Sequence, residues 1–85
     1  MSKKLEFFKK KLLYRASYRG TKEMDILLSS FVKKHINTFN LNQLKKLEKF
    51  LEYEDEIILD FYNFNKYKNG IEKNDISKIF KSFKI

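Results

Sequence analysis

Apolar side chains recur along the chain three and four residues apart, a spacing that places them on one face of an α-helix. In one segment, for example, the spacing runs through Met24, Leu27 and Phe31. Proline is absent, glycine occurs only at positions 20 and 70, and no run alternates apolar and polar residues as a strand would. The pattern therefore predicts an all-α fold with five helices, over residues 4–18, 21–36, 41–53, 55–65 and 72–84.

Each predicted helix has one apolar stripe, and these stripes form the candidate core. The connections between the helices are short, so neighbouring helices are expected to pack against each other as a small five-helix bundle. A chain of 85 residues is expected to form a single domain, spanning residues 1–85. The expected inward residues are Leu5, Phe8, Leu12 and Ala16; Met24, Leu27, Leu28, Phe31 and His35; Leu44, Leu47, Phe50 and Leu51; Ile57, Ile58, Phe61 and Phe64; and Ile76, Ile79, Phe80 and Phe83.

Polar residues at the predicted helix ends indicate how the chain turns. Asn40 is the expected N-cap of the third helix, with Gln43 as its capping-box partner. The Asn-Gly pair at 69–70 is a turn signal before the last helix. Gly20 has two alternatives. It ends the first helix in a left-handed conformation, or it is the N-cap of the second helix with Glu23 at the third helical position.

The net charge of +8 comes from 19 basic and 11 acidic residues. An excess of basic over acidic residues favours nucleic acid, an anionic membrane or an acidic protein as partner. Only two of the basic residues are arginine, however, and phosphate-reading surfaces usually favour arginine. We favour a nucleotide bias in the genome as the explanation of this Lys-, Asn-, Ile- and Phe-rich composition. No apolar run approaches the roughly 20 residues of a membrane span, and the absence of cysteine excludes disulfides and thiolate chemistry.

The sequence offers little for catalysis. The single histidine, His35, lies near the end of the second predicted helix, where it complements the helix dipole. The acidic residues at 54–56 are consecutive, so they fan out around the start of the fourth helix and stabilise its dipole without a metal. No glycine-rich phosphate loop is present, and a bundle of this size has little room for a deep pocket. We therefore predict no catalytic, metal or cofactor-binding residue, and a binding protein rather than an enzyme.

One short motif, Arg19-Gly20-Thr21-Lys22-Glu23, has the form R-G-x-x-E. By itself it describes a corner between two helices, and such corners are common. Its surroundings are more specific: LYRASY precedes it at residues 13–18, MDILL follows at 24–28, and FLEYED stands at 50–55. Together with the chain length, this arrangement resembles the SdhE-type succinate dehydrogenase assembly factors, called assembly factor 2 in mitochondria. The resemblance covers about residues 12–82.

The resemblance implies a function and a binding surface. Members of this family are small five-helix proteins that bind the flavoprotein subunit of succinate dehydrogenase, and in bacteria also the related subunit of fumarate reductase. They promote covalent attachment of FAD to a histidine of that subunit, so FAD is carried by the partner and none is expected to be held stably here. The motif lies on the binding surface, which gives Arg19, Gly20 and Glu23 as partner-binding residues.

The motif also suggests how such a surface would work. The turn needs the glycine, and a partner can approach closely where Gly20 has no side chain. Arg19 is expected to point outward as a planar donor fork, and Glu23 as an acceptor. Arg15 and Tyr18 lie within one turn of this corner and are expected rim contacts.

The chain departs from the family pattern in four respects. Ser30 stands where the family often has proline, before Phe31, and Asp55-Glu56 stands where Asp-Pro is common. Phe61 replaces the usual tryptophan of the fourth helix. These three changes concern packing and helix starts, which tolerate them. The strong positive charge is the larger departure, and it leaves room for a second partner or a more acidic one.

Two other functions are alternatives. A basic helical nucleic-acid-binding protein would need its cations on one face with aromatics or arginines among them, but the lysines at 9–11 spread about 200° around their helix. A first helix lying on an anionic membrane would have to withdraw five aromatic or leucine side chains from the core. The first 19 residues have the charge of a mitochondrial presequence, with Glu6 as their one acid. They also form the first predicted helix, so we favour a bacterial cytoplasm over the mitochondrial matrix.

Overall fold

The computed structural model describes residues 3–64 and 71–84. Within these residues the chain forms helices and no strand, so the predicted all-α fold with five helices is confirmed. The turn signal at 69–70 lies outside the described residues. The helices are α1 (Lys3–Ser17), α2 (Lys22–His35), α3 (Leu41–Leu51), α4 (Asp55–Phe64) and α5 (Asp75–Ser82).

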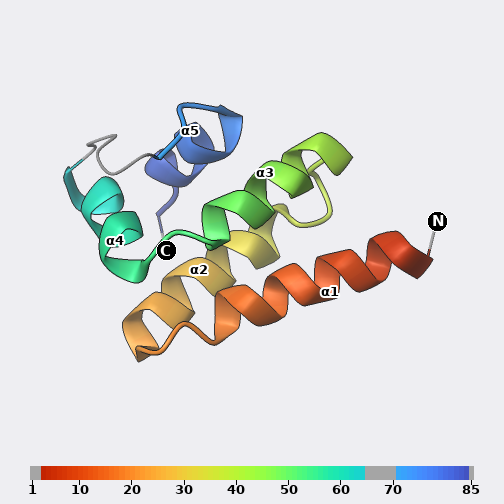
Figure 1. Ribbon diagram of the computed structural model, residues 1–85, viewed down its shortest axis with the longest axis horizontal. Coiled ribbons are helices and arrows are strands. Elements are labelled where there is room, and N and C mark those ends of the chain that lie inside the picture. Colours follow the sequence, from red (N-terminus) through yellow and green to blue (C-terminus); the bar gives the residue numbers. More distant parts are fainter. Residues whose placement is uncertain (1–2, 65–70, 85) are drawn as a thin grey trace.

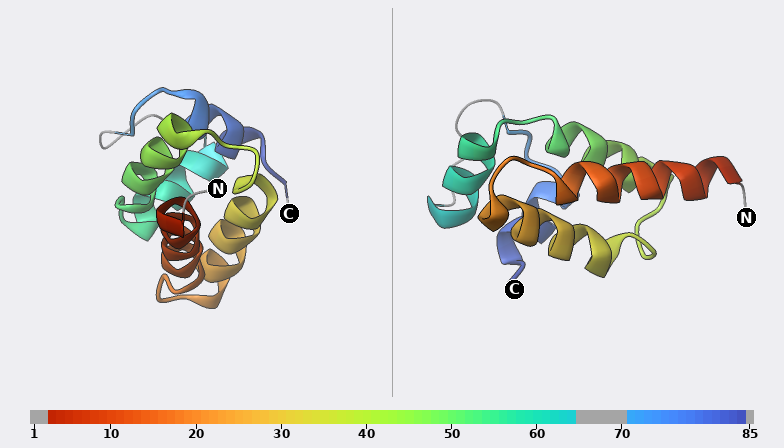
Figure 2. Two further views of the ribbon diagram at one scale, coloured as in Figure 1. Left: turned by 90° about the vertical axis from the view of Figure 1, so that its right-hand side faces the viewer. Right: turned by 90° about the horizontal axis from the view of Figure 1, so that it is seen from below.

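The long helix α1 forms one edge of the molecule, with the N-terminus at its free end (Figure 1). α2 runs back beside α1, and α3 also packs on α1 (Figure 2). α5 packs on α3 and on α4. α4 lies at the end of the molecule where α1 turns into α2 (Figure 1). This arrangement brings two corners of the chain together: the one between α1 and α2, and the one between α3 and α4.

Phe80 of α5 is the centre of the core. Its ring lies 5.0 Å from Phe31 of α2 and 5.0 Å from Phe50 of α3, measured between ring centroids. It also contacts Phe61 and Tyr62 of α4, at 6.4 and 5.1 Å. Three of these pairs are tilted or edge-to-face and the pair with Phe61 is near parallel, and aromatic pairs of these kinds add to the stabilisation from buried area. The last helix therefore joins three others, although it is only eight residues long.

The predicted apolar stripes form most of this core, with one clear error. Phe64 is 62% exposed, although we predicted it to face inward. α4 buries the face of Ile58 and Phe61, and Phe64 lies about 90° around the helix from the middle of that face. The connections also contribute, because Phe39 and Ile71 are buried. Neither was predicted, since helical periodicity says nothing about residues between helices.

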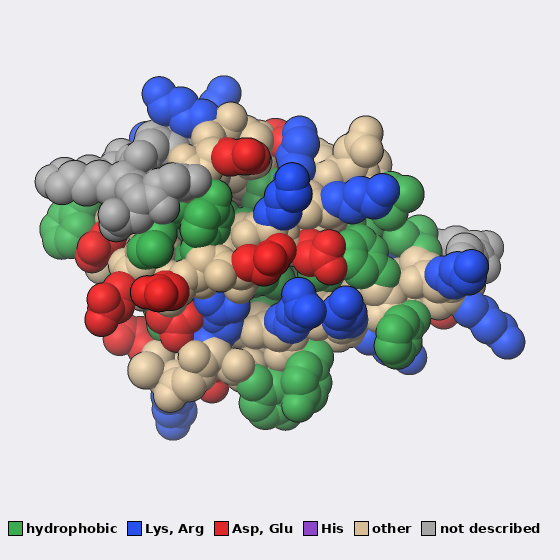
Figure 3. Space-filling model, in the orientation of Figure 1, with side chains coloured by type: hydrophobic (Ala, Val, Ile, Leu, Met, Phe, Trp, Pro, Cys, Tyr) green, Lys and Arg blue, Asp and Glu red, His purple; other side chains and the backbone are tan. Residues whose placement is uncertain are grey.

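Charge is distributed unevenly over the surface. Residues 50–64 contain five acidic residues and no cation. In Figure 3 the acidic side chains gather at the α4 end of the molecule, and basic side chains lie along α1 and α3. The molecule is therefore polarised, with its negative charge concentrated near the corner between α3 and α4.

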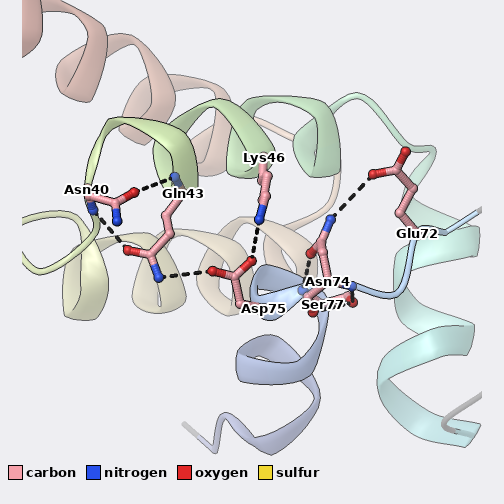
Figure 4. A network of polar contacts seen from close by, with 7 residues as sticks. All are labelled: Asn40, Gln43, Lys46, Glu72, Asn74, Asp75 and Ser77. Atoms are coloured by element: carbon pink, nitrogen blue, oxygen red, sulfur yellow. Dashed lines mark hydrogen bonds and ion pairs between the residues drawn. The ribbon is translucent and has the colours of Figure 1, made fainter.

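Side-chain caps fix the starts of α3 and α5 (Figure 4). The predicted capping box between Asn40 and Gln43 is present, with both hydrogen bonds at 2.9 Å. A second capping box pairs Asn74 with Ser77 at 3.0 Å, so α5 begins at Asp75 and not at residue 72 as predicted. The box is visible in the sequence, but with serine in place of the usual Glu or Gln.

Asp75 also links α5 to α3 (Figure 4). Its carboxylate accepts hydrogen bonds from Lys46, at 3.0 Å, and from the side-chain amide of Gln43, at 3.1 Å. These two donors hold the pKa of Asp75 below its usual value. The link therefore needs an ionised carboxylate and is expected to weaken in acid.

Candidate functional site

The R-G-x-x-E motif forms the corner between α1 and α2. Gly20 has a φ of +112°, a conformation that disfavours any residue with a Cβ atom. α2 is capped by Thr21, whose hydroxyl accepts a hydrogen bond from the backbone N–H of Met24 at 3.3 Å. Of the two alternatives for Gly20, neither holds as stated. The positive φ is present, but α1 already ends at Ser17, so Gly20 does not end that helix, and the N-cap of α2 is Thr21. A threonine side chain supplies the acceptor that a glycine lacks, so Glu23 is not at the third helical position.

Asp25 fixes the backbone of this corner from the first turn of α2. Its carboxylate accepts a hydrogen bond from the backbone N–H of Arg19, across the bend at Gly20. Arg19 N–H is thereby satisfied although it lies outside both helices. Asp25, which no sequence motif singles out, therefore belongs to the corner as much as the motif residues do.

The side chain of Arg19 points into the molecule, and the prediction that it points outward is wrong. Its Nε donates to Asp55 Oδ1 at 2.8 Å, and its two terminal nitrogens donate to the carbonyls of Leu51 and Tyr53 at 2.5 and 2.7 Å. Only 11% of the side chain is exposed. The physical reason is the end of α3, whose last carbonyls have no partner within the helix. A guanidinium offers enough donors to satisfy two carbonyls and a carboxylate together.

These contacts make an "Arg19 clamp", by which we mean Arg19, Asp55 and the carbonyls of Leu51 and Tyr53. The clamp joins the α1–α2 corner to the α3–α4 corner, which lie 32 to 36 residues away in sequence. The charges of the clamp interact favourably with the dipoles of α3 and α4. The guanidinium stands at the negative end of α3, and the Asp55 carboxylate stands in the first turn of α4, at the positive end.

The other predicted site residues lie on the surface around the clamp. Arg15, Gly20 and Glu23 are exposed, and Tyr18 is 70% exposed. An ideal Cβ atom built on Gly20 would meet no atom within 4 Å. Four of the five predicted residues are thus exposed at or next to the corner, and the side chain of Arg19 is largely buried.

An open groove of about 330 Å³ adjoins the corner. It is lined by Tyr18, Arg19, Glu54 and Asp55. Arg19 therefore borders an acidic surface, formed by Glu54 and Asp55 from the second corner. The three consecutive acidic residues at 54–56 are visible in the sequence, but their position beside Arg19 depends on how the two corners pack.

His35, the single histidine, belongs to the aromatic packing at the end of α2. Its ring stacks on Phe39 at 5.3 Å and contacts Phe31 at 5.1 Å. Burial, followed by the positive charge of Lys34, lowers the pKa of His35 below its usual value. Among residues 3–64 and 71–84, no group of three His, Cys, Asp or Glu side chains is placed to hold a metal ion. The ring contacts assign His35 a packing role.

Stability should therefore fall on mild acidification, and His35 should be the cause. A pKa below the unfolded value means that the unfolded chain binds the proton more readily. The contribution of neutral His35 to the free energy of unfolding is fully present above the pKa of an unfolded histidine, about 6.5. It is lost as the pH falls from there towards the pKa of His35 in the folded state. We expect the free energy of unfolding, measured by urea titration, to decrease between pH 7 and pH 5. In His35→Gln this decrease should largely disappear. A wild-type profile that is flat over this range would contradict the prediction.

The five helices, with no strand among the described residues, place the chain in the class of small all-α proteins. The family described as flavinator of succinate dehydrogenase matches residues 10–84, and the chain belongs to this family. It is a family of assembly factors rather than catalytic enzymes.

Curated relatives come from bacteria and from mitochondria. The chain is 36% identical over 53 residues to the FAD assembly factor SdhE of Acetobacter pasteurianus, covering 62% of this chain and 49% of the relative. It is 43% identical over 47 residues to mitochondrial succinate dehydrogenase assembly factor 2-B of Drosophila simulans, covering 55% and 30%. The corresponding factor of the yeast Meyerozyma guilliermondii is 38% identical over 47 residues, covering 55% and 35%.

The matches thus span between about a third and a half of the relatives' own lengths. Since both kinds of relative are present, the predicted bacterial cytoplasm stays a prediction. No solved structure matches the chain. None of the helices described is long and apolar enough to cross a membrane.

Proposed function

We propose that this protein binds the flavoprotein subunit of succinate dehydrogenase and promotes covalent attachment of FAD to it. The observation that carries the proposal is the family match over residues 10–84, which contains the whole corner from Arg15 to Glu23 and the helix ends that hold it. The names of the bacterial and mitochondrial relatives, FAD assembly factor and succinate dehydrogenase assembly factor, support it.

The surface around Gly20 is the proposed contact with the flavoprotein. Gly20 has no side chain and open space beside it, so a partner surface can approach its backbone closely. Glu23 offers an exposed acceptor on the first turn of α2, and Arg15 and Tyr18 stand at the rim. Arg19 contributes from below, because the clamp fixes the corner on which the other four residues are displayed.

The proposed mechanism is a shift of conformational populations in the partner. FAD is carried by the flavoprotein, and the bond to its histidine forms inside that subunit. By binding one conformation of the flavoprotein more tightly, the small protein would raise the population in which flavin and histidine are aligned. A rigid binding surface serves this purpose, since a ligand shifts an equilibrium only by its difference in affinity for the two states. The flavoprotein of fumarate reductase is the second partner to test, on the strength of the resemblance seen in the sequence.

Reconstitution tests the proposal directly. The purified apo-flavoprotein of succinate dehydrogenase is mixed with FAD, with and without this protein, and covalent flavin is measured by fluorescence in a denaturing gel. We expect covalent flavin to form faster when the protein is present. Equal rates with and without it, together with no complex on gel filtration, would refute the proposal.

Glu23→Ala should weaken binding to the flavoprotein without destabilising the fold. Glu23 is exposed, and its loss leaves a partner donor unpaired at a cost of about 1–3 kcal/mol, or about 5- to 150-fold in Kd. The matched control is Lys22→Ala, its exposed neighbour, which should bind normally. Titration calorimetry gives Kd and a thermal melt by circular dichroism gives Tm, which should change by less than about 3 °C. Equal Kd values for the two variants would remove Glu23 from the contact.

A further inference from the structure

α1 has a second apolar stripe, which faces outward. Phe7 is 72% exposed, Tyr14 66% and Tyr18 70%. Phe7 and Tyr14 are seven residues apart, so their side chains follow one line along the helix for about 10 Å. Tyr18 comes directly after the last residue of α1. Leu12 and Ala16, on the opposite side of α1, are fully buried. The rings of Tyr14 and Tyr18 contact each other, with centroids 4.7 Å apart.

Basic residues border this stripe on both sides. At about 100° per residue, the positions next to the stripe all lie within roughly 40–80° of it. They are Lys3 and Lys10 on one side, and Lys4, Lys11 and Arg15 on the other. All five are exposed, and Lys11 also forms an ion pair with Glu48 of α3 at 3.9 Å. α1 has one acidic residue, Glu6. We call the three aromatics and these five cations the α1 outer face.

A membrane contact does not require α1 to unpack from the core. The sequence pattern alone suggested that α1 would have to withdraw its aromatic and leucine side chains from the core to reach a membrane. In the structure the inward stripe stays in place while Phe7, Tyr14 and Tyr18 are already outside it. The α1 outer face is therefore available without any change in packing.

We propose that the α1 outer face binds the surface of an anionic lipid membrane. Aromatic side chains with a polar edge settle at the level of lipid headgroups. Lysines beside them extend to anionic headgroups and bury their stems. A straight helix along the edge of the molecule suits a flat surface, and Figures 1 and 2 show α1 in that position.

The charge of the rest of the molecule favours the same orientation. The acidic residues gather at the α4 end, by the last turn of α1, whereas the first turns of α1 are basic (Figure 3). An anionic surface would repel the α4 end and attract the N-terminal half of α1. The contact is therefore centred on Phe7 and its neighbouring lysines.

Lipid fits this face better than nucleic acid or an acidic protein. Four of the five flanking cations are lysine, and lysine neutralises lipid phosphate without the fork geometry for which nucleic-acid surfaces use arginine. The grooves of about 330 and 320 Å³ that adjoin Arg19 and His35 are lined by no residue of the N-terminal half of α1.

A single tryptophan tests the contact, because the chain contains none. Phe7→Trp is mixed with vesicles of phosphatidylcholine alone or of phosphatidylcholine with phosphatidylglycerol. We expect a blue shift of its emission, and quenching by brominated lipid, with the anionic vesicles only. The matched control is Phe64→Trp, since Phe64 is an aromatic of similar exposure at the acidic end of the molecule. Its emission should stay unchanged, and equal shifts for the two probes would overturn the proposal.

Charge variants give an independent test by co-sedimentation with the same vesicles. The double variant Lys3→Gln, Lys10→Gln should lower the partition coefficient roughly 25-fold, at about fivefold per cation. The control Lys45→Gln, Lys49→Gln removes the same charge from exposed positions on α3 and should have a much smaller effect. Equal losses for the two pairs would show attraction by net charge alone and would overturn the assignment to α1.

A third measurement distinguishes a lipid membrane from nucleic acid as the ligand of the α1 outer face. Single-stranded oligothymidine at 150 mM salt should leave Phe7→Trp emission unquenched. Quenching by the oligonucleotide without a response to anionic vesicles would make the face a nucleic-acid site and overturn the proposal. Reconstituted flavinylation needs no membrane, so its success or failure is independent of all three results.

Discussion

Arg19→Ala should lower the free energy of unfolding by about 2–4 kcal/mol, the largest stability effect that we expect of any polar residue in the chain. The substitution leaves Asp55, the carbonyl of Leu51 at the end of α3 and the carbonyl of Tyr53 just beyond it without their donors in a largely buried place. Removing one partner of a buried charged pair is costly because the other partner stays buried. For a domain of this size the corresponding fall in Tm is roughly 10–30 °C. Urea unfolding followed by circular dichroism at 222 nm measures it.

Two further variants make the Arg19 experiment specific. Arg15→Ala removes the other arginine of the chain, which is exposed, and should change stability by no more than about 0.5 kcal/mol. Arg19→Lys keeps the charge but loses the planar fork, so it should recover only a minor part of the loss. If Arg19→Ala were as stable as Arg15→Ala, the clamp would contribute nothing measurable to the fold.

Gly20→Arg should abolish support of flavinylation while the protein stays folded, and Gly20→Ala should not. Both variants must adopt the φ of +112°, at a cost of about 1–2 kcal/mol. Neither side chain meets an internal obstacle at its Cβ atom. The two variants are thus matched in stability and differ mainly in the volume that projects from the corner. An arginine there would hold the flavoprotein away from Glu23 and leave polar groups of both proteins unpaired.

The measurement compares covalent flavin formation and Tm for the two glycine variants. We expect Tm values within a few degrees of each other, both below the wild-type value, and covalent flavin near the background rate for Gly20→Arg alone. Equal losses of flavinylation, each accounted for by lowered stability, would mean that Gly20 shapes the corner and does not lie under the partner.

The existence and order of the helices could be predicted because helical periodicity is a local signal. Residues such as Leu12, Phe31, Leu47 and Phe80 stand at the spacing that a buried face requires, and all are buried. Helix ends were predicted less well. Asn74 and Ser77 shorten α5 by a capping box of unusual composition, and α3 ends two residues before the predicted boundary, where its last carbonyls meet Arg19.

The candidate site could be located from the sequence, but the direction of its arginine could not. The motif and the glycine turn depend on neighbouring residues, and both lie where they were predicted. The partners of the Arg19 side chain come from a corner more than 30 residues away. Their position depends on how α3 packs against α1, which no local pattern reports. For the same reason the bond between Arg19 and Asp55 could not be predicted, and Asp55 was expected only to stabilise the dipole of the fourth helix.

The long sequence separation of the clamp has a consequence for the rates of folding and unfolding. Contacts between helices that follow one another in sequence form early, because the loops to be closed are short. The pairing of Arg19 with Asp55 closes a segment of 36 residues and needs α3 to be in place first. Interactions made after the transition state slow unfolding and leave the folding rate almost unchanged. The clamp should therefore lengthen the lifetime of the folded corner, so that the surface around Gly20 stays assembled between encounters with a partner.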